Sequence, residues 1–278
     1  MQSPLILVIG STGKTGRRVA QRLDERGYNV RRGSRNSKIP FDWDRPETWV
    51  KALSGVSAAY ISYFPDLAFP GAPEKIKALT ECAVAAGVKR LVLLSGRGET
   101  HAQRCEDIVR RCSLDFTLIR ASWFAQNFSE GYLLEPMLGG VIPLPAGDVF
   151  EPIVDVDDIA DVAVAALTED RHSGELYEIT GPRLLSFTDV AQILSDSSKR
   201  EVRYTPITFD QFHATMTEVG GQMIADVFTG ICREVLDGRN AWLGDGVQRA
   251  LGREPRDFSE FCHIASDSGA WNLDSPGQ

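Results

Sequence analysis

Hydrophobic and polar positions follow two alternating patterns along the first 180 residues. Short, mostly apolar runs are typical of strands buried on both faces of a sheet, and apolar residues repeated every three or four positions are typical of helices. The strand-like runs lie at 4–9, 28–33, 56–62, 90–95, 115–120 and 176–180, and helical segments between them lie at 14–26, 44–53, 72–86, 99–111 and 159–167. Strands that alternate with helices build right-handed βαβ units with a parallel sheet. We therefore expect a doubly wound α/β fold.

The pattern changes after Gly181-Pro182, where helical stretches predominate around one candidate strand at 201–205. These stretches lie at 187–197, 208–219, 222–237, 246–251 and 257–265. We expect a sheet domain over residues 1–182, a smaller and mostly helical cap over 183–265, and a polar, frayed tail over 266–278.

Composition excludes several classes of protein. The 278 residues are 43% hydrophobic, and no apolar run approaches the roughly 18–20 residues needed to cross a bilayer. Five cysteines without a CxxC spacing and four scattered histidines argue against a zinc site or a disulfide framework. The net charge of −8 argues against nucleic acid as a partner. We expect a cytoplasmic monomer or homodimer that binds a small molecule, with no metal, membrane or nucleic-acid partner.

A glycine-rich turn, Gly10-Ser11-Thr12-Gly13-Lys14-Thr15-Gly16, joins the first predicted strand to the first predicted helix. The first glycine permits a tight turn, the second lets the backbone approach a pyrophosphate, and the third allows close packing of helix on sheet. The helix N-terminus then faces the anion. A turn without a ligand would show the same spacing, but the strand–turn–helix context favours a dinucleotide site. The sheet domain is therefore expected to be a Rossmann-type NAD(P)-binding domain.

The second strand ends without the acidic residue that usually binds the ribose of NAD. It reads Val30-Arg31-Arg32-Gly33-Ser34-Arg35, within a segment 14–38 that holds nine basic and two acidic residues. Ser34 and Arg35 suit a 2′-phosphate, because a guanidinium fork matches its oxygens, while the other two arginines could face solvent. NADP(H) is therefore the favoured cofactor, with NAD(H) as the alternative.

Further motifs follow the glycine turn along the chain. They are Phe41-Asp42-Trp43-Asp44, Ser62-Tyr63-Phe64-Pro65, Leu91-Val92-Leu93-Leu94-Ser95-Gly96, Phe116-Thr117-Leu118-Ile119-Arg120 with Trp123-Phe124 and Asn127, Val154-Asp155-Val156-Asp157-Asp158-Ile159-Ala160 and Tyr177-Glu178-Ile179-Thr180-Gly181-Pro182. With the glycine turn, they resemble the NmrA-like group of atypical short-chain dehydrogenases/reductases. That group includes NADPH-dependent quinone reductases, NADPH sensors and isoflavone-reductase-like enzymes. The likeness spans about residues 4–265 and looks closest to the bacterial branch named after ergot-alkaloid-type iminium reductases.

The resemblance implies where a cofactor and a substrate would lie. The cofactor would be lined from the strand ends by Ser62, Tyr63, Phe64, Ser95 and Gly96, and near the nicotinamide by Phe124 and Asn127. Asp42 and Trp43, after a presumed third strand, are placed to border the adenine, although Trp43 could equally be core. A substrate pocket, to which 123–150 contributes, would be walled by Phe64, Arg97, Trp123, Phe128, Tyr132, Met137 and Phe228. Some of these aromatic residues must be core.

The sequence departs from the family on the helix that usually carries catalytic residues. Typical short-chain dehydrogenases use a Tyr-xxx-Lys pair on this helix to protonate a carbonyl, but here no tyrosine lies between Tyr63 and Tyr132. Reduction of an iminium by hydride needs no proton donor, and a quinone accepts hydride readily while water supplies the proton. We expect an NADPH-dependent oxidoreductase that transfers hydride to a bulky, apolar imine or iminium, a quinone or another conjugated acceptor.

Two further functions stay open, a non-catalytic NADP(H) redox sensor and a non-redox catalyst on the same scaffold. Tyr63 and His101 are the candidate catalytic residues. Tyr63 could instead pack on the nicotinamide, and His101 could be a solvated residue early in a helix. The acidic residues Asp155, Asp157 and Asp158 are expected to cap the helix at 159–167 rather than bind metal.

Overall fold

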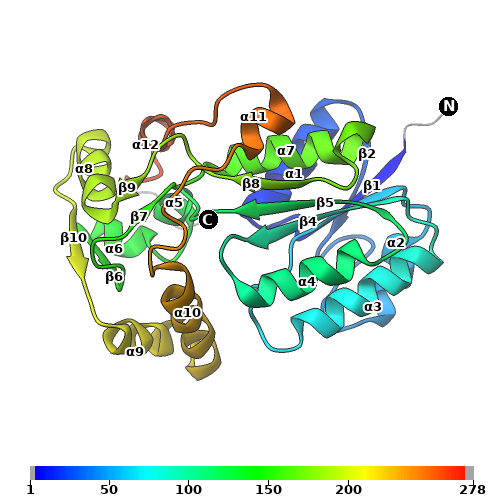
Figure 1. Cartoon of the computed structure of the whole chain (residues 1–278), viewed down its shortest axis with the longest axis horizontal. Coiled ribbons are helices and arrows are strands. Elements are labelled where there is room, and N and C mark those ends of the chain that lie inside the picture. Colours follow the sequence, from blue (N-terminus) through cyan, green and yellow to red (C-terminus); the bar gives the residue numbers. More distant parts are fainter. Residues whose placement is uncertain (1–3, 273–278) are drawn as a thin grey trace. The chain divides into compact units, whose positions relative to one another are not determined.

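All six predicted strands pair into one parallel sheet in the computed structural model, which describes residues 4–272. The strands are β1 (Leu5–Ile9), β2 (Asn29–Gly33), β3 (Ala58–Ile61), β4 (Arg90–Gly96), β5 (Asp115–Ala121) and β8 (Leu176–Ile179). Their order is β2-β1-β3-β4-β5-β8, and each neighbouring pair is parallel (Figure 1). Leu7, Val92 and Leu118 are fully buried, as expected for strands covered on both faces. The doubly wound α/β fold is confirmed.

Helices cover both faces of this sheet (Figure 1). One face carries α1 (Lys14–Glu25), α7 (Val156–Thr168) and α11 (Gly246–Leu251), and the other carries α2 (Glu47–Leu53), α3 (Ala72–Ala85) and α4 (Thr100–Arg110). A short 3₁₀ helix, η1 (Asp170–His172), leads from α7 into β8. Helix α1 buries Val19, Ala20 and Leu23 against the sheet and ends before Gly27, whose φ of 78° lies in the left-handed region.

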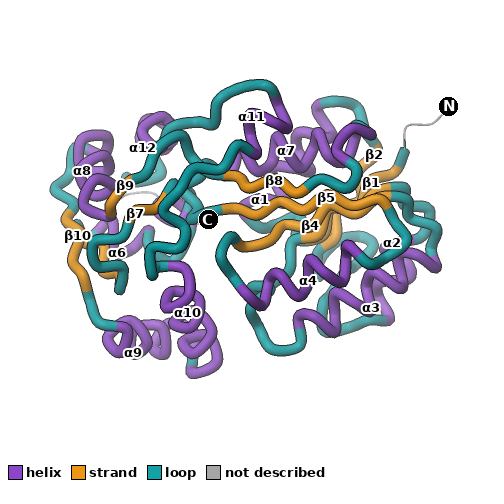
Figure 2. Tube along the Cα trace, in the orientation of Figure 1, coloured by secondary structure: helices purple, strands orange, loops and turns teal. Residues whose placement is uncertain are grey.

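The other described elements form a second unit that is mostly helix and loop (Figure 2). Its helices are α5 (Asn127–Glu130), α6 (Leu134–Leu138), α8 (Phe187–Ser198), α9 (Phe209–Gly220), α10 (Gln222–Val235) and α12 (Phe258–Asp267). Strand β6 (Val141–Leu144) pairs in parallel with β10 (Arg203–Pro206), and β7 (Phe150–Glu151) pairs antiparallel with β9 (Leu185–Ser186). The sequence predicted only β10, because β6 contains a proline and the other two strands are two residues long.

The boundaries of the two units differ from the predicted domains. The first unit comprises the described residues up to Ala121 with Val156–Ile179 and Asp245–Arg253. The second comprises Ser122–Asp155, Thr180–Gly244 and the described residues from Glu254 on. The segment before α7 therefore belongs to the second unit, and α11 belongs to the sheet. Helix α11 packs closely on β8: Gly246 has no Cβ, and one there would lie 2.5 Å from the Glu178 carbonyl oxygen. Arg249 of the same helix pairs with Glu175, just before β8.

Two local expectations are corrected. The presumed third strand before Asp42 is absent, because 34–46 forms turns and loop. The predicted tail over 266–278 is not frayed where it is described: Trp271 is buried, and its Nε1 donates a hydrogen bond to the Phe128 carbonyl oxygen at 2.9 Å. The rest of that tail, 273–278, lies outside the described residues. Within 4–272, no helix is long and apolar enough to span a membrane.

Candidate cofactor site and active site

The glycine turn lies where the sheet order reverses, since β1 has β2 on one side and β3 on the other. Gly10 adopts a φ of 76°, and a Cβ there would come within 3.1 Å of the Ser62 Cβ at the end of β3. A Cβ at Gly16 would overlap the Gly10 carbonyl oxygen. Ligands of open α/β sheets bind at such a reversal, outside the carboxyl ends of the strands. Glycines 10 and 16 therefore let strand, turn and helix meet closely there.

The groups around this turn suit a pyrophosphate. Helix α1 begins at Lys14 after Gly13, which offers no side-chain cap to the first backbone N–H groups. Thr12 is exposed and Thr15 is buried. The Ser11 hydroxyl is buried and has no hydrogen-bond partner in the described part of the chain. A buried hydroxyl without a partner costs free energy, and a phosphate oxygen would accept its hydrogen bond. The residues present therefore fit the dinucleotide that the spacing predicted.

The arginines at the end of β2 divide into two kinds. Arg31 Nη1 donates to the carbonyl oxygens of Ala52 and Ser54, both at 2.7 Å, and so caps α2. Arg32 pairs with Asp24 at 2.7 Å. Arg35 is exposed, and no partner is found for it within 4–272. The neighbouring Ser34 hydroxyl lies 2.7 Å from the Ser37 hydroxyl in the turn that follows.

Tyr63 lies in an aromatic cluster beside α3. Its ring centroid is 4.6 Å from that of Trp43, which in turn packs on Phe41 and Trp49. Trp43 is buried, which agrees with the alternative that it is a core residue. The backbone carbonyl of its neighbour Asp42 accepts a hydrogen bond from Trp49. Burial raises the pKa of the Tyr63 phenol, while the nearby Lys75 ammonium lowers it. The next residue, Phe64, is by contrast 68% exposed.

A row of polar side chains crosses the carboxyl ends of three strands. Ser95 of β4 is paired in register with Arg120 of β5, and Arg120 with Glu178 of β8, so the three lie on one face of the sheet. Glu106 of α4, which is 1% exposed, covers this row. Its carboxylate accepts hydrogen bonds from Arg120 Nε and Nη2, at 2.8 and 2.6 Å, and from the Ser95 hydroxyl at 2.7 Å.

The same network reaches the residue after β4. Glu178 accepts hydrogen bonds from Arg97 Nε at 2.7 Å and from Arg120 Nη1 at 3.3 Å. Arg97 is 3% exposed, and its backbone N–H donates to Ala121. The Glu106 carboxylate raises the pKa of Arg120 above its ordinary value. Ser95 and Arg97 are thus tied together through Glu106, Arg120 and Glu178.

A family model described as NmrA-like matches residues 2–261. The chain belongs to the NmrA-like family. Agroclavine dehydrogenase of Claviceps fusiformis is 31% identical over 294 residues, covering 96% of this chain and 98% of that protein. NAD(P)H azoreductase of Xenophilus azovorans is 29% identical over 304 residues, covering 96% and 100%. These relatives place the chain in a family of NAD(P)H-dependent oxidoreductases.

A solved structure supports the fold. The triphenylmethane reductase of Citrobacter sp., complexed with NADP(H), superposes with a TM-score of 0.72 over 95% of this chain and 99% of that one. Its sequence is 22% identical, so the likeness shows the NmrA-like fold alone.

Within the described residues, neither candidate catalytic residue of this NmrA-like protein hydrogen-bonds to the polar row. His101, the second residue of α4, is exposed. Tyr63 is in the aromatic cluster. At the end of β4, the Glu99 side chain lies against Gly96, so close that a Cβ at position 96 would overlap it. The sequence analysis missed Glu106 and Glu178. The signal for Glu178, as for Arg120, was a charge inside a strand whose other positions are mostly apolar, whereas Glu106 had no signal of its own.

In the second unit, the predicted pocket residues fall into two groups. Phe128 and Met137 are fully buried in its core. Trp123, Tyr132 and Phe228 are partly exposed, and the rings of Tyr132 and Phe228 are 6.4 Å apart. Burial raises the pKa of the Tyr132 phenol well above its ordinary value. The two residues expected near the nicotinamide also belong to this unit: Phe124 forms an isolated bridge with Val154, and Asn127 begins α5.

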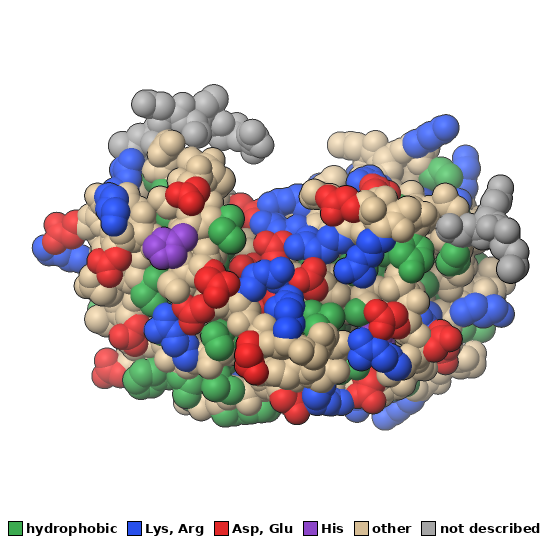
Figure 3. Space-filling model, turned by 90° about the horizontal axis from the view of Figure 1, so that it is seen from above, with side chains coloured by type: hydrophobic (Ala, Val, Ile, Leu, Met, Phe, Trp, Pro, Cys, Tyr) green, Lys and Arg blue, Asp and Glu red, His purple; other side chains and the backbone are tan. Residues whose placement is uncertain are grey.

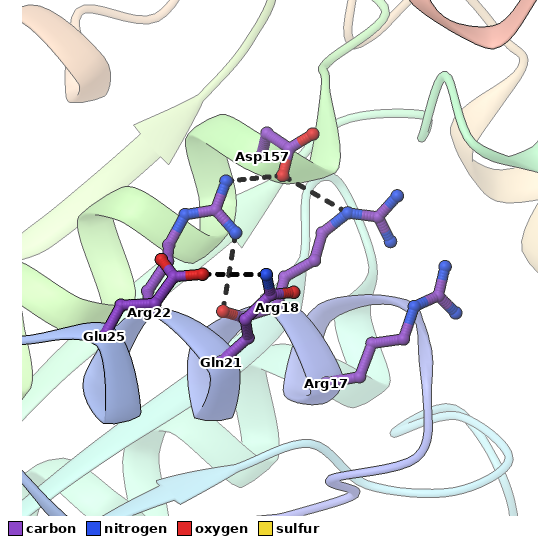
Figure 4. Close-up of a pocket in the computed structure, with 6 residues that line it drawn as sticks. All are labelled: Arg17, Arg18, Gln21, Arg22, Glu25 and Asp157. Atoms are coloured by element: carbon purple, nitrogen blue, oxygen red, sulfur yellow. Dashed lines mark hydrogen bonds and ion pairs between the residues drawn. The ribbon is translucent and has the colours of Figure 1, made fainter. Parts of the chain in front are cut away.

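The acidic residues near α7 take part in ion pairs. The helix begins at Val156, so Asp157 and Asp158 lie in its first turn rather than before it. Asp157 pairs with Arg18 and Arg22 of α1 across a hollow of about 350 Å³ (Figure 4), and Asp158 pairs with Arg253. The other acidic residue, Asp155, accepts a hydrogen bond from Gln126. Acidic and basic side chains are also interspersed on the face in Figure 3.

Proposed function

We propose that this protein is an NADPH-dependent reductase that transfers hydride to a bulky, largely apolar iminium, quinone or other conjugated acceptor. The observation that carries the proposal is the glycine turn at the reversal of the sheet, with its buried and unpartnered Ser11 hydroxyl. Oxidoreductase relatives that align over nearly their whole length support it.

The end of β2 favours NADPH over NADH. Arg31 and Arg32 are engaged by the α2 carbonyls and by Asp24, which leaves Arg35 as an exposed guanidinium at the strand end. A guanidinium donates paired hydrogen bonds to phosphate oxygens and carries the opposite charge. In this proposal the turn at 10–16 holds the pyrophosphate, while Arg35 and Ser34 hold the 2′-phosphate.

In this proposal the protein binds and positions the hydride donor and the acceptor, and it supplies no general acid. When bound, NADPH supplies the hydride. Helix α4 carries Glu106, which pairs with Arg120 of β5, in place of a Tyr-xxx-Lys pair, and the Tyr63 ring packs against Trp43. An iminium needs no proton donor, because hydride addition gives a neutral amine, and a quinone takes its proton from water. Holding hydride donor and acceptor in line is then the main catalytic contribution.

The second unit carries aromatic side chains on which such an acceptor could pack. Trp123, Tyr132 and Phe228 are partly exposed aromatic side chains. Planar conjugated molecules pack well on aromatic rings. We propose these three residues, rather than the fully buried Phe128 and Met137, as the ones that contact the acceptor.

Titration calorimetry of the purified protein with NADPH and with NADH tests the cofactor assignment. We expect preferential binding of NADPH, and we expect Arg35→Ala to weaken NADPH by about tenfold or more while leaving NADH unchanged, because a lost hydrogen bond to a charged group costs about 1.5–3 kcal/mol. Arg32→Ala is the matched control, since it removes a neighbouring arginine that is already paired with Asp24. Failure of both nucleotides to bind would overturn the proposal.

A panel of iminium compounds and quinones then tests the reaction. We expect NADPH oxidation with at least one member of either class, followed at 340 nm. Tight NADPH binding with no oxidation across the panel would contradict the reductase and favour the non-catalytic sensor. In that case NADPH and NADP⁺ must bind with different affinities, because equal affinities leave no free energy for a switch.

A further inference from the structure

The polar row is the last layer of the sheet before its carboxyl edge. Two residues earlier on the same face, Leu93, Leu118 and Leu176 pair in register and form an apolar layer. Ser95, Arg120 and Glu178 replace that layer at the edge itself. Buried ion pairs are often no more stabilising than apolar side chains of similar size, so stability alone does not account for the change.

The direction of the hydrogen bond at Ser95 follows from the charges around it. Arg120 donates one hydrogen bond to each oxygen of the Glu106 carboxylate, so both oxygens act as acceptors. The Ser95 hydroxyl must then donate its single proton to Glu106. Its oxygen keeps lone pairs with which it can accept a hydrogen bond from a ligand. Ser95 is thus fixed as an acceptor.

The order of the strands places Ser95 relative to the dinucleotide. The proposed 2′-phosphate site is at the end of β2, the pyrophosphate turn follows β1, and β4 lies beyond β1 and β3 in the opposite direction. A dinucleotide laid across the carboxyl ends, with its adenylate half toward β2, extends its other half toward β4. The hydrogen-bond donors of that half are the nicotinamide carboxamide and the ribose hydroxyls.

We infer that Ser95 accepts a hydrogen bond from the nicotinamide ribonucleoside half of bound NADPH, and that Glu106 is the positioning residue that keeps Ser95 in the accepting state. This inference rests on the proposed function. Arg120 acts through Glu106, because its two hydrogen bonds hold the carboxylate in place beside Ser95.

The test compares two ligands by calorimetry. NADPH contains the nicotinamide ribonucleoside, and adenosine 2′,5′-bisphosphate shares its phosphorylated adenosine but lacks that half. We expect Ser95→Ala to weaken NADPH by about fivefold, the effect of one lost hydrogen bond, and to leave the bisphosphate unchanged. Ser57→Ala is the matched control, because the Ser57 hydroxyl donates to Leu5 at the opposite edge of the same sheet. It should change neither affinity.

A double-mutant cycle tests the positioning role of Glu106. In Glu106→Gln the side-chain amide can donate to Ser95 and so abolish its fixed direction. We expect Glu106→Gln to weaken NADPH in the wild-type background and to have no further effect in Ser95→Ala, whereas a purely structural role would lower affinity equally in both backgrounds and overturn the positioning role. Should Glu106→Gln fail to fold, the Ser95→Ala comparison decides.

Other outcomes separate this inference from the proposed function. Unchanged NADPH affinity in Ser95→Ala, or equal weakening of both ligands, overturns the inference alone. Absence of any binding to the wild-type protein overturns the cofactor assignment as well.

Discussion

Gly16 lies against the carbonyl oxygen of Gly10, so close that a Cβ at position 16 would overlap it. This contact joins the first turn of α1 to the end of β1 and shapes the turn proposed to hold the pyrophosphate. We expect Gly16→Ala to destabilise the protein by about 2 kcal/mol and to weaken NADPH binding, because helix and turn must move apart.

Urea unfolding and calorimetry measure both effects. Gly230→Ala is a matched control, because Gly230 lies within α10 and no atom is found within 4 Å of a Cβ added there. It should raise stability slightly, by about 0.5–1 kcal/mol, since alanine is the better helix former. Equal stability of Gly16→Ala and the wild type would contradict the packing argument.

His172 should make the protein less stable in mild acid. Its ring is fully buried, Nδ1 lies 2.8 Å from the Tyr177 hydroxyl, and burial, assisted by Arg171, lowers its pKa below the ordinary value despite the opposing effect of Glu169. The unfolded chain therefore binds the proton more readily, and stability falls as the pH drops through about 6.5.

We expect the free energy of unfolding to fall between pH 7.5 and 5.5, and to fall less steeply in His172→Gln. The exposed His263 provides the control, since His263→Gln should keep the wild-type slope. Identical slopes for His172→Gln and the wild type would show that His172 does not cause the dependence.

The ion pair of Arg183 and Asp257 should contribute stability that is lost at lower pH. The guanidinium donates to both carboxylate oxygens at 2.7 and 2.9 Å, which holds the pKa of Asp257 well below its usual range. The contribution is therefore present above about pH 3.8 and disappears as the pH falls toward the folded-state pKa.

Arg183→Ala removes the pair and leaves Asp257 to cap α12 through the Ser259 backbone N–H. We expect a loss of up to about 1 kcal/mol at pH 6, because the pair is partly exposed, and a smaller loss at pH 3. Chemical denaturation at the two pH values measures the difference, and a loss independent of pH would count against the ion pair.

Trp271 should be needed for the stability of the second unit. Its indole is buried against Phe261 and donates a hydrogen bond to the Phe128 carbonyl. We expect Trp271→Phe to cost about 1–3 kcal/mol, because the buried carbonyl loses its donor, and Trp271→Ala to cost about 3–5 kcal/mol. Thermal unfolding would measure whether Trp271→Ala loses more stability than Trp271→Phe. If both variants unfolded at the wild-type midpoint, Trp271 would not contribute to stability.

The parts of the fold that local patterns determine could be predicted from the sequence. The run Leu5–Ile9, the glycine turn and the amphipathic segment after it lie next to each other in the chain, so their contacts follow from their order. The two-residue strands β7 and β9 could not be predicted, because pairing between distant segments, not hydrophobic period, defines them. Trp271 was assigned to a tail for the same reason: its partner, Phe128, lies 143 residues earlier.

The candidate site divides in the same way. Arg35 could be selected as a cofactor residue from its position after β2, but only the structure shows that Arg31 and Arg32 are engaged elsewhere. Glu106 gave no signal of its own within a polar helix. Its contact with both residues is seen only in the structure, where the register of β4 and β5 sets Ser95 beside Arg120 under the Glu106 carboxylate.

The division into units has a consequence for synthesis of the chain. The first unit is built from three stretches, so the backbone passes between units five times, and no single cut releases either unit as one continuous fragment. A chain emerging from the ribosome has made 34 residues of the second unit, Ser122–Asp155, before α7 and β8 can complete the sheet. The usual order, in which an N-terminal domain finishes folding before the next begins, is therefore not available to this protein.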